Sequence, residues 1–514
     1  MFRNQSSLAA PVAVLALSIL GCADTRLAHN AANYSAESYS LIEENRFHSA
    51  AQTPLSTFAA DVDTASYSNV RRFLRDGQLP PKDAVRIEEL INYFRYEGED
   101  PEGEHPVRID TETAPCPWNE QTDLVRISVR TKSFEMAELP AVNLVFLIDV
   151  SGSMQSRDKL PLLTRSLSLL TEQLRPQDRV AITVYAGSAG LVLPPTSGTD
   201  RARILSVLDT LRAGGSTAGA AGIQLAYQTA RESFNPDGVN RVILATDGDF
   251  NVGLSSDSEL VRLIEEQRAS GVLLSVLGFG IGNLNDSMME RLADYGNGSY
   301  AYIDSLLEAR RALVDQVGAT LATVAKDVKL QVEFNPHLVG SYRLVGYENR
   351  LLAAEDFNDD EKDAGEMGAG HIVTALYETR SAAGALNSLP SVDPLRYQQR
   401  SGRLEDGKDR EILTVKIRYK LPGSDDSRLI ATPLLQDDRP SGRSSESFRF
   451  AAAVAEFGLL LRDSEFKGDA SYQRVVELAE SAVGGDPAGV RTEFVYLAKT
   501  AARLSDEAAL SAKR

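Results

Sequence analysis

Apolar and polar positions change their spacing along the chain, and each spacing predicts a different kind of element. Between residues 141 and 323, short runs that are apolar at nearly every position alternate with longer segments of helical periodicity. The apolar runs predict buried strands at 144–148, 180–185, 241–246, 272–279 and 299–303. The intervening segments predict helices at 158–174, 200–212, 219–233, 257–269, 286–295 and 305–322. Such alternation is typical of an α/β domain with a doubly wound, mainly parallel sheet buried on both faces.

The segments on either side of this region follow other patterns. From residue 53 to 140, a helical face that includes Leu90 precedes "LVRISVRTK", which alternates like a strand with one solvated face. From residue 324 to 510, half-exposed strands such as "ILTVKIRYKL" give way to helices beyond Ser447. We therefore expect a small N-terminal α+β domain at 53–140, the α/β domain at 141–323, and a β-rich plus helical domain at 324–510.

The first residues predict export. Arg3 precedes a short apolar run, and this run leads into "LSILGC", which ends at Cys22. The pattern is typical of a secretory signal and resembles the lipidation motif of bacterial lipoproteins. That resemblance implies a signal peptide at 1–21, a lipid on Cys22, and a polar tether at 22–52. Ala23 after the cysteine then favours the outer membrane, with the domains facing the periplasm or the exterior. A plain signal peptide with an incidental cysteine is the alternative.

Composition narrows the classes of function. The chain has 514 residues, more than one core accommodates, and 25% of them are charged, as in a soluble globular protein. A formal net charge of −18 argues against nucleic acid as a partner. The five histidines show no metal-ligand spacing, so zinc chemistry is unsupported. Cys116 has no histidine or basic residue beside it, which favours a buried structural thiol over a nucleophile.

Oxygen-bearing side chains follow two of the predicted strands. In "NLVFLIDVSGSM", Asp149 comes directly after a strand, and Ser151 and Ser153 alternate in the turn that follows. Thr217 lies between a glycine pair and a helix, and Asp247 ends the run "VILATD". Ligands of open α/β sheets bind at the carboxyl ends of the strands, so we expect these side chains to converge there. Carboxylates and hydroxyls without His or Cys predict a hard cation, Mg²⁺ first, with Mn²⁺ or Ca²⁺ as alternatives. Taken alone, "DVSGS" also fits an ordinary turn at a strand end.

The same residues resemble the metal-ion-dependent adhesion site of von Willebrand factor type A (VWA) domains, where DxSxS is followed by a later Thr and a later Asp. All five positions match, with Thr217 rather than Ser216 aligned to the threonine of the family. The resemblance implies a Rossmann-like domain whose metal completes its shell with an Asp or Glu of a protein partner. The flanks, including "LPPKDAVRIEELINYF" and "EFNPHLVGSYRLVGYENRLL", resemble those of a bacterial VWA lipoprotein family. In that family they are an N-terminal VWA-associated domain and a C-terminal domain of unknown function.

Other motifs give weaker indications. "DVDTA" at 61–65 resembles a phosphatase nucleophile motif, but Ala65 stands where Thr or Val is needed, which favours a structural acidic turn. "GFGIGN" at 278–283 lacks the GxGxxG spacing, so no nucleotide is expected. The acidic stretch 356–367 begins like a Ca²⁺ loop but lacks its glycine and its final glutamate. A solvated loop is expected there, with a second Ca²⁺ site as the alternative.

Together these features predict a membrane-anchored binding protein rather than an enzyme. A divalent cation at the oxygen-rich edge would bind an acidic residue of a protein partner. A metal-assisted hydrolase is one alternative, although no general base sits beside the motif and Asp249 is the nearest spare carboxylate. A scaffold whose metal only stabilises the fold is the other.

Overall fold

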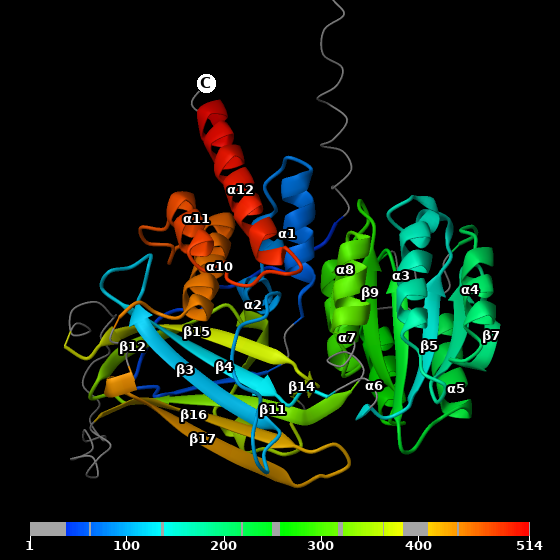
Figure 1. Ribbon diagram of the computed structural model, residues 1–514, viewed down its shortest axis with the longest axis horizontal. Helices are drawn as coiled ribbons and strands as arrows, with labels where there is room; N and C mark the ends of the chain where they lie inside the picture. Colours follow the sequence, from blue (N-terminus) through cyan, green and yellow to red (C-terminus); the bar gives the residue numbers. More distant parts are fainter. Residues whose placement is uncertain are drawn as a thin grey trace, which may run out of the picture.

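The chain folds into two bodies that lie side by side (Figure 1). The computed structural model describes residues 37–60, 63–134, 138–216, 219–248, 257–316, 322–362, 364–383, 410–438 and 442–512. We call residues 142–315 the central domain, and the described residues before and after it the flanking unit. The predicted metal ligands fall within the range of the central domain, and the predicted lipidation site is Cys22. Cys22 and the predicted ligand Thr217 lie outside the described residues.

The central domain contains a mainly parallel sheet with the strand order β10-β9-β8-β5-β6-β7. Only the β6–β7 pair is antiparallel among the described pairs of this sheet. The strands are β5 (Val142–Asp149), β6 (Arg179–Tyr185), β7 (Ala189–Ser197), β8 (Val239–Thr246), β9 (Leu273–Phe279) and β10 (Tyr300–Ile303). The helices are α3 (Leu160–Glu172), α4 (Arg201–Thr210), α5 (Gly219–Glu232), α6 (Asp257–Arg268), α7 (Asp286–Tyr295) and α8 (Leu306–Arg310), with a π-helical turn at Arg311–Asp315.

Helices cover both faces of this sheet, as the apolar runs predict (Figure 1). Every residue of β5 is buried. Since successive side chains of a strand point to opposite faces, Phe146 packs into one apolar core with α3 and α4, whereas Val145 and Leu147 pack into another with α5 and α7. The predicted fold class of the central domain is therefore confirmed.

The flanking unit is built around two antiparallel sheets that pack face to face. Their strand orders are β1-β12-β15-β4-β3 and β13-β2-β11-β16-β17, and β14 pairs with β11. The strands before the central domain are β1 (His48–Ser49), β2 (Leu55–Ala59), β3 (Val107–Pro115) and β4 (Asp123–Thr131). Those after it are β11 (Thr323–Phe334), β12 (Val339–Val345), β13 (Leu351–Leu352), β14 (Gly365–Gly368), β15 (Ile372–Ser381), β16 (Glu411–Lys420) and β17 (Ser427–Leu435).

Both sheets mix strands from the two ends of the chain. In one sheet β2 pairs with β11, and in the other β4 pairs with β15. Side chains of all these strands share one apolar core between the sheets, including Val125 of β4 and Leu330 of β11. The ranges 53–140 and 324–510, which the sequence patterns separate into two domains, therefore form one structural unit into which the central domain is inserted.

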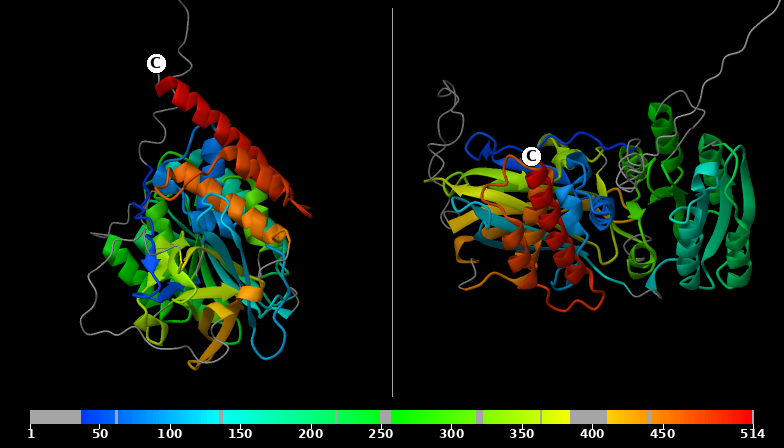
Figure 2. Two further views of the ribbon diagram at one scale, coloured as in Figure 1. Left: turned by 90° about the vertical axis from the view of Figure 1, so that its left-hand side faces the viewer. Right: turned by 90° about the horizontal axis from the view of Figure 1, so that it is seen from above.

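Helices cover the outer face of one of these sheets (Figures 1 and 2). They are α1 (Ala65–Arg75), α2 (Ile87–Asn92), α10 (Glu446–Arg462), α11 (Tyr472–Glu480) and α12 (Val490–Ala512). Their shared core includes Phe94, Phe450 and Phe494, whose rings meet edge to face. No helix of the described ranges, α12 included, is apolar over enough length to span a bilayer.

Candidate metal site

Two of the predicted carboxylates lie at neighbouring strand ends of the central sheet. Asp149 is the last residue of β5, and Asp247 comes directly after β8. These strands pair in parallel up to Ile148 and Ala245, so both chains leave the sheet at the same edge. Both carboxylates have an exposed fraction of 0%. Two buried carboxylates at one edge need donors or a cation to compensate their charge.

Hydrogen bonds fix the Asp149 carboxylate. Its Oδ1 accepts a hydrogen bond from the Ser151 amide at 2.9 Å, and its Oδ2 accepts from the Tyr185 and Thr246 hydroxyls, each at 3.1 Å. Burial raises the pKa of Asp149, although its hydrogen bonds with Ser151 act in the opposite direction. The carboxylate is thus held in one orientation by three hydrogen bonds.

The serine hydroxyls of the turn face each other beside this carboxylate. Ser151 Oγ and Ser153 Oγ lie 3.0 Å apart, at the start of a 3₁₀ turn that spans Gly152–Gln155. The Gly152 amide donates to the Gly215 carbonyl at 3.1 Å, which holds the turn against the loop that precedes Thr217 in the sequence. Ser151 also hydrogen-bonds Asp149, and Ser153 hydrogen-bonds Asp247. A continuous run of oxygens therefore connects the two carboxylates through the two hydroxyls.

A lysine completes the group, and the sequence patterns do not indicate it. Lys159 Nζ donates to Asp247 Oδ2 at 2.9 Å and to Asn283 Oδ1 at 2.8 Å. The lysine is 7% exposed. Burial alone would raise the pKa of Asp247, but the hydrogen bond and the charge of Lys159 hold it below its usual value. Lys159 immediately precedes α3, and nothing in its spacing from the DVSGS motif marks it as part of a site.

The described donor set fits a hard divalent cation. It consists of the two carboxylates and two hydroxyls of Asp149, Ser151, Ser153 and Asp247, without a thiolate or an imidazole. Thr217, the fifth predicted ligand, lies outside the described residues. The geometry brings four of the five predicted residues together, and coordination of a metal by all five stays a prediction.

The N-terminal part of the described chain passes along one wall of this site. Glu37 Oε1 accepts a hydrogen bond from the Gly282 amide at 3.0 Å, and the Ser38 amide donates to the Leu284 carbonyl at 3.0 Å. Asn283, which binds Lys159, lies between these two contacts in the chain. Part of the segment predicted as a tether, 22–52, is therefore attached to the loop between β9 and α7.

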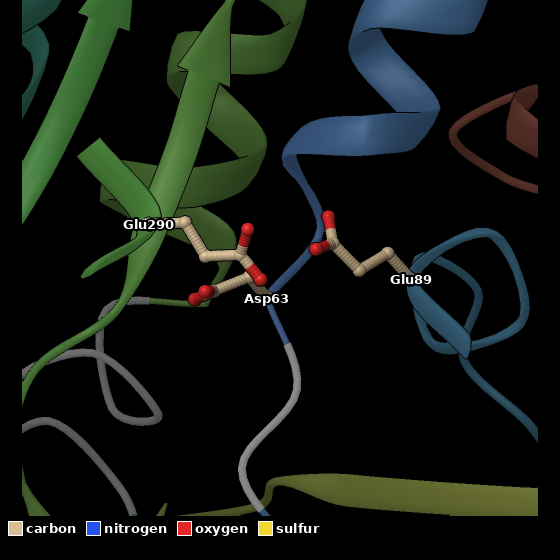
Figure 3. A group of neighbouring side chains, drawn as sticks. All are labelled: Asp63, Glu89 and Glu290. Atoms are coloured by element: carbon tan, nitrogen blue, oxygen red, sulfur yellow. The ribbon is translucent and has the colours of Figure 1, made fainter. Parts of the chain in front are cut away.

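Another group of carboxylates lies where the two bodies meet (Figure 3). One oxygen each of Asp63, Glu89 and Glu290 lie within 4.8 Å of one another, and all three residues are buried. Arg350 binds Asp63 at 3.3 Å and Glu290 at 3.7 Å, and Arg86 forms an ion pair with Glu89. Because each of these carboxylates already forms an ion pair with a guanidinium group of the chain, we assign this group to the join between the two bodies. Asp63 accordingly has a structural role, whereas Asp61 and Val62 of the motif at 61–65 lie outside the described residues.

The acidic loop considered as a Ca²⁺ site uses its carboxylates within the fold. Asp360 accepts two hydrogen bonds from the Arg418 guanidinium, both at 3.1 Å, and Asp356 accepts one from the Ala353 amide at 3.0 Å. Residue 363 of this loop lies outside the described residues. Asp356 and Asp360 thus bind different partners within the chain. This agrees with the solvated loop that the sequence predicts.

Comparisons with known proteins agree with this architecture. The family model "von Willebrand factor type A domain" matches residues 143–316, and "von Willebrand factor" matches 33–126. The central domain is a VWA domain. A third model, "Uncharacterized protein YfbK, C-terminal", matches residues 319–504. The chain is 45% identical to Uncharacterized protein YfbK of Escherichia coli K12 over 483 residues, which cover 92% of this chain and 83% of that protein. The chain belongs to the YfbK family.

More distant proteins are also similar to parts of the chain. Uncharacterized protein sll0103 of Synechocystis is 27% identical over 185 residues, covering 36% of this chain and 43% of that protein. Human inter-alpha-trypsin inhibitor heavy chain H4 is 30% identical over 159 residues, covering 29% of this chain and 17% of that protein. A solved structure, a von Willebrand factor type A protein from Catenulispora acidiphila, is 17% identical with a TM-score of 0.41, covering 75% of this chain and 89% of that chain.

Proposed function

We propose that this protein binds a divalent cation, Mg²⁺ first, and uses it to hold an aspartate or glutamate of a protein partner. VWA domains commonly bind such a cation and mediate protein interactions. The observation that supports the proposal most is the continuous run of oxygens from Asp149 through Ser151 and Ser153 to Asp247. Thr217 would supply a further hydroxyl.

The residues of the chain have distinct tasks in this proposal. Asp149 supplies a negative charge that Tyr185 and Thr246 keep oriented toward the site. Ser151 and Ser153 supply neutral oxygens, which add ligands without adding charge. Mg²⁺ prefers about six oxygen ligands and commonly keeps some water, which leaves a position for an oxygen from outside. The bound cation would supply the positive charge that attracts the carboxylate of the partner.

A binding function agrees better with these groups than hydrolysis does. The charged group bonded to Asp247 is the ammonium of Lys159, and a cation held in this way is not a general base. Asp249, the spare carboxylate of the sequence, lies outside the described residues. We therefore propose a binding protein without catalytic activity, anchored in the cell envelope by a lipid on Cys22 and most simply in the outer membrane.

Replacement of Asp149 by alanine tests this proposal. Calorimetry with Mg²⁺ and Mn²⁺ should detect binding to the wild type and none to Asp149→Ala, while the variant keeps a cooperative thermal transition. Asp209→Ala is the matched control, because Asp209 is an exposed carboxylate of α4 in the same domain. Unchanged metal affinity in Asp149→Ala would exclude the site.

Crosslinking on intact cells tests the partner. We expect a protein that is captured by the wild type but not by Asp149→Ala. Equal capture of the partner by both proteins would favour a scaffold. Metal-dependent turnover of a hydrolase substrate, lost in the same variant, would favour the enzyme instead.

A further inference from the structure

Lys159 places a positive charge inside the proposed metal site. Its ammonium contacts Asp247 at 2.9 Å, and that carboxylate hydrogen-bonds Ser153, one of the proposed ligands. The ion pair is largely removed from solvent, with exposed side-chain fractions of 8% for Lys159 and 0% for Asp247. Charges this close and this buried interact far more strongly than they would in water.

Several contacts hold the ammonium in this position. The Lys159 side chain passes over Gly280, where a Cβ atom would lie 2.3 Å from both Cγ and Cε of the lysine. Asn283 accepts the second hydrogen bond of the ammonium. Tyr302 donates to the Gly280 carbonyl at 2.9 Å, which anchors the loop. The lysine is therefore built into the site and does not sample solvent like a surface lysine.

We propose that Lys159 makes the metal-loaded site an acceptor for one carboxylate. Two aspartates alone would neutralise a divalent cation and leave the loaded site without net charge. The ammonium of Lys159 leaves one positive charge in excess, and a single carboxylate from a partner neutralises it. The inference rests on the proposed function, and it identifies the residue that gives the loaded site its preference for a monoanionic partner group.

The charge of Lys159 has opposite effects on the two binding steps, which are binding of the metal to the empty site and binding of a carboxylate to the loaded site. The positive charge repels the cation, so it weakens metal binding to the empty site. The same charge attracts an anion, so it strengthens carboxylate binding to the loaded site. A substitution that only damaged the fold would weaken both steps, whereas removal of the charge alone should strengthen one and weaken the other.

Lys159→Gln in the full chain tests the inference, because glutamine keeps donors for Asp247 and removes the charge. Calorimetry should show Mn²⁺ bound about tenfold more tightly than by the wild type. Water-proton relaxation of the Mn²⁺-loaded protein should show acetate bound about fivefold more weakly. Lys82→Gln is the matched control, because it removes a lysine from an exposed pair with Asp463 in the flanking unit. Both affinities should stay at their wild-type values in this control.

Asn283→Asp provides a second test that keeps Lys159 in place. The added carboxylate neutralises the ammonium, so this variant should also bind Mn²⁺ more tightly and acetate more weakly. Mn²⁺ affinity that is unchanged or reduced in both variants overturns the inference, even when the wild type binds metal. A wild type that binds no Mn²⁺ overturns the proposed function itself, so the two failures are distinguishable.

Discussion

Arg86 of the flanking unit and Asp286 of the central domain form a buried ion pair across the boundary between the two bodies. Arg86 precedes α2, whereas Asp286 is the first residue of α7. The exposed fraction of Asp286 is 0%, and its Oδ1 also accepts a hydrogen bond from Tyr300 at 3.0 Å. The pair therefore fixes the central domain relative to the sheets into which it is inserted.

Loss of this pair should be costly. Arg86→Met leaves Asp286 buried without its main cation, and breaking a buried pair in this way costs about 3–5 kcal/mol. We expect the free energy of unfolding, measured in urea, to fall by about this amount. Lys82→Met removes an exposed pair with Asp463 and should cost less than about 1 kcal/mol. Equal losses in the two variants would contradict the assignment of Arg86 to the join.

Glu88 should make stability depend on pH. Burial, followed by the charge of Glu348, raises the pKa of Glu88 to about 7. The folded chain then keeps a proton that the unfolded chain releases near its ordinary pKa of about 4.3, so this stabilisation is present at low pH and is lost as the pH rises toward 7. Glu88→Gln should therefore gain up to about 3 kcal/mol over the wild type between about pH 4 and pH 8. Urea unfolding across this range measures the difference, and a difference that does not change with pH would refute the prediction.

Gly280 should not tolerate a side chain. Its φ of +77° disfavours other residues, and a Cβ atom would also lie 2.3 Å from Lys159. Gly77 has a φ of +74° but no atom within 4 Å of the position of a Cβ. Gly77→Ala should therefore cost about 1 kcal/mol through its backbone alone, and Gly280→Ala should cost clearly more. The difference between the melting temperatures of the two variants measures the effect of the contact with Lys159. Similar melting temperatures would argue against a clash between the added side chain and Lys159.

The thiol of Cys116 should be inert in the native protein. The residue is buried, and burial, followed by the charge of Glu378, raises the pKa of its thiol to about 12. Because the thiolate is the reactive form, a disulfide reagent should react with this cysteine only after denaturation. Cys116→Ser is the control, since any signal from Cys22 persists in it. Rapid reaction of the native wild type, absent in this variant, would contradict a structural role.

Local patterns were sufficient to predict the central domain. Runs such as the one that forms β5 are buried on both faces, and their apolar character is visible without knowledge of the partner strand. The edge strand β7 was not predicted, because it is half exposed and contains Pro194 and Pro195. Of the helix expected at 305–322, the described part is α8 followed by a π-helical turn ending at Asp315, and residues 317–321 lie outside the described residues.

The interleaved sheets of the flanking unit could not be predicted in this way. An alternating pattern identifies a half-buried strand but does not specify its partner. The pairing of β2 with β11 joins residues that are separated by the whole central domain. Only long-range packing selects that pairing, and it leaves no local trace in the sequence.

The candidate site also combines residues that the sequence could predict with one that it could not. The adjacency of Asp149 and Asp247 follows from the rule for strand ends, so their meeting could be predicted. Lys159 reaches Asp247 through a long side chain that crosses the loop at Gly280, and sequence spacing does not reveal such a reach. The glycines of "GFGIGN", considered above as a nucleotide loop, include the one that makes room for this lysine.

The insertion of the central domain also sets an order of events during synthesis. The central domain consists of consecutive residues and can complete its sheet soon after it leaves the ribosome. Strand β2, in contrast, has no described partner until β11 at 323–334 has been made, and β4 waits for β15 at 372–381 to gain its second neighbour. During this interval, unpaired strand edges can recruit strands of other chains. Truncated products that end within the central domain should therefore be the aggregation-prone species of this protein.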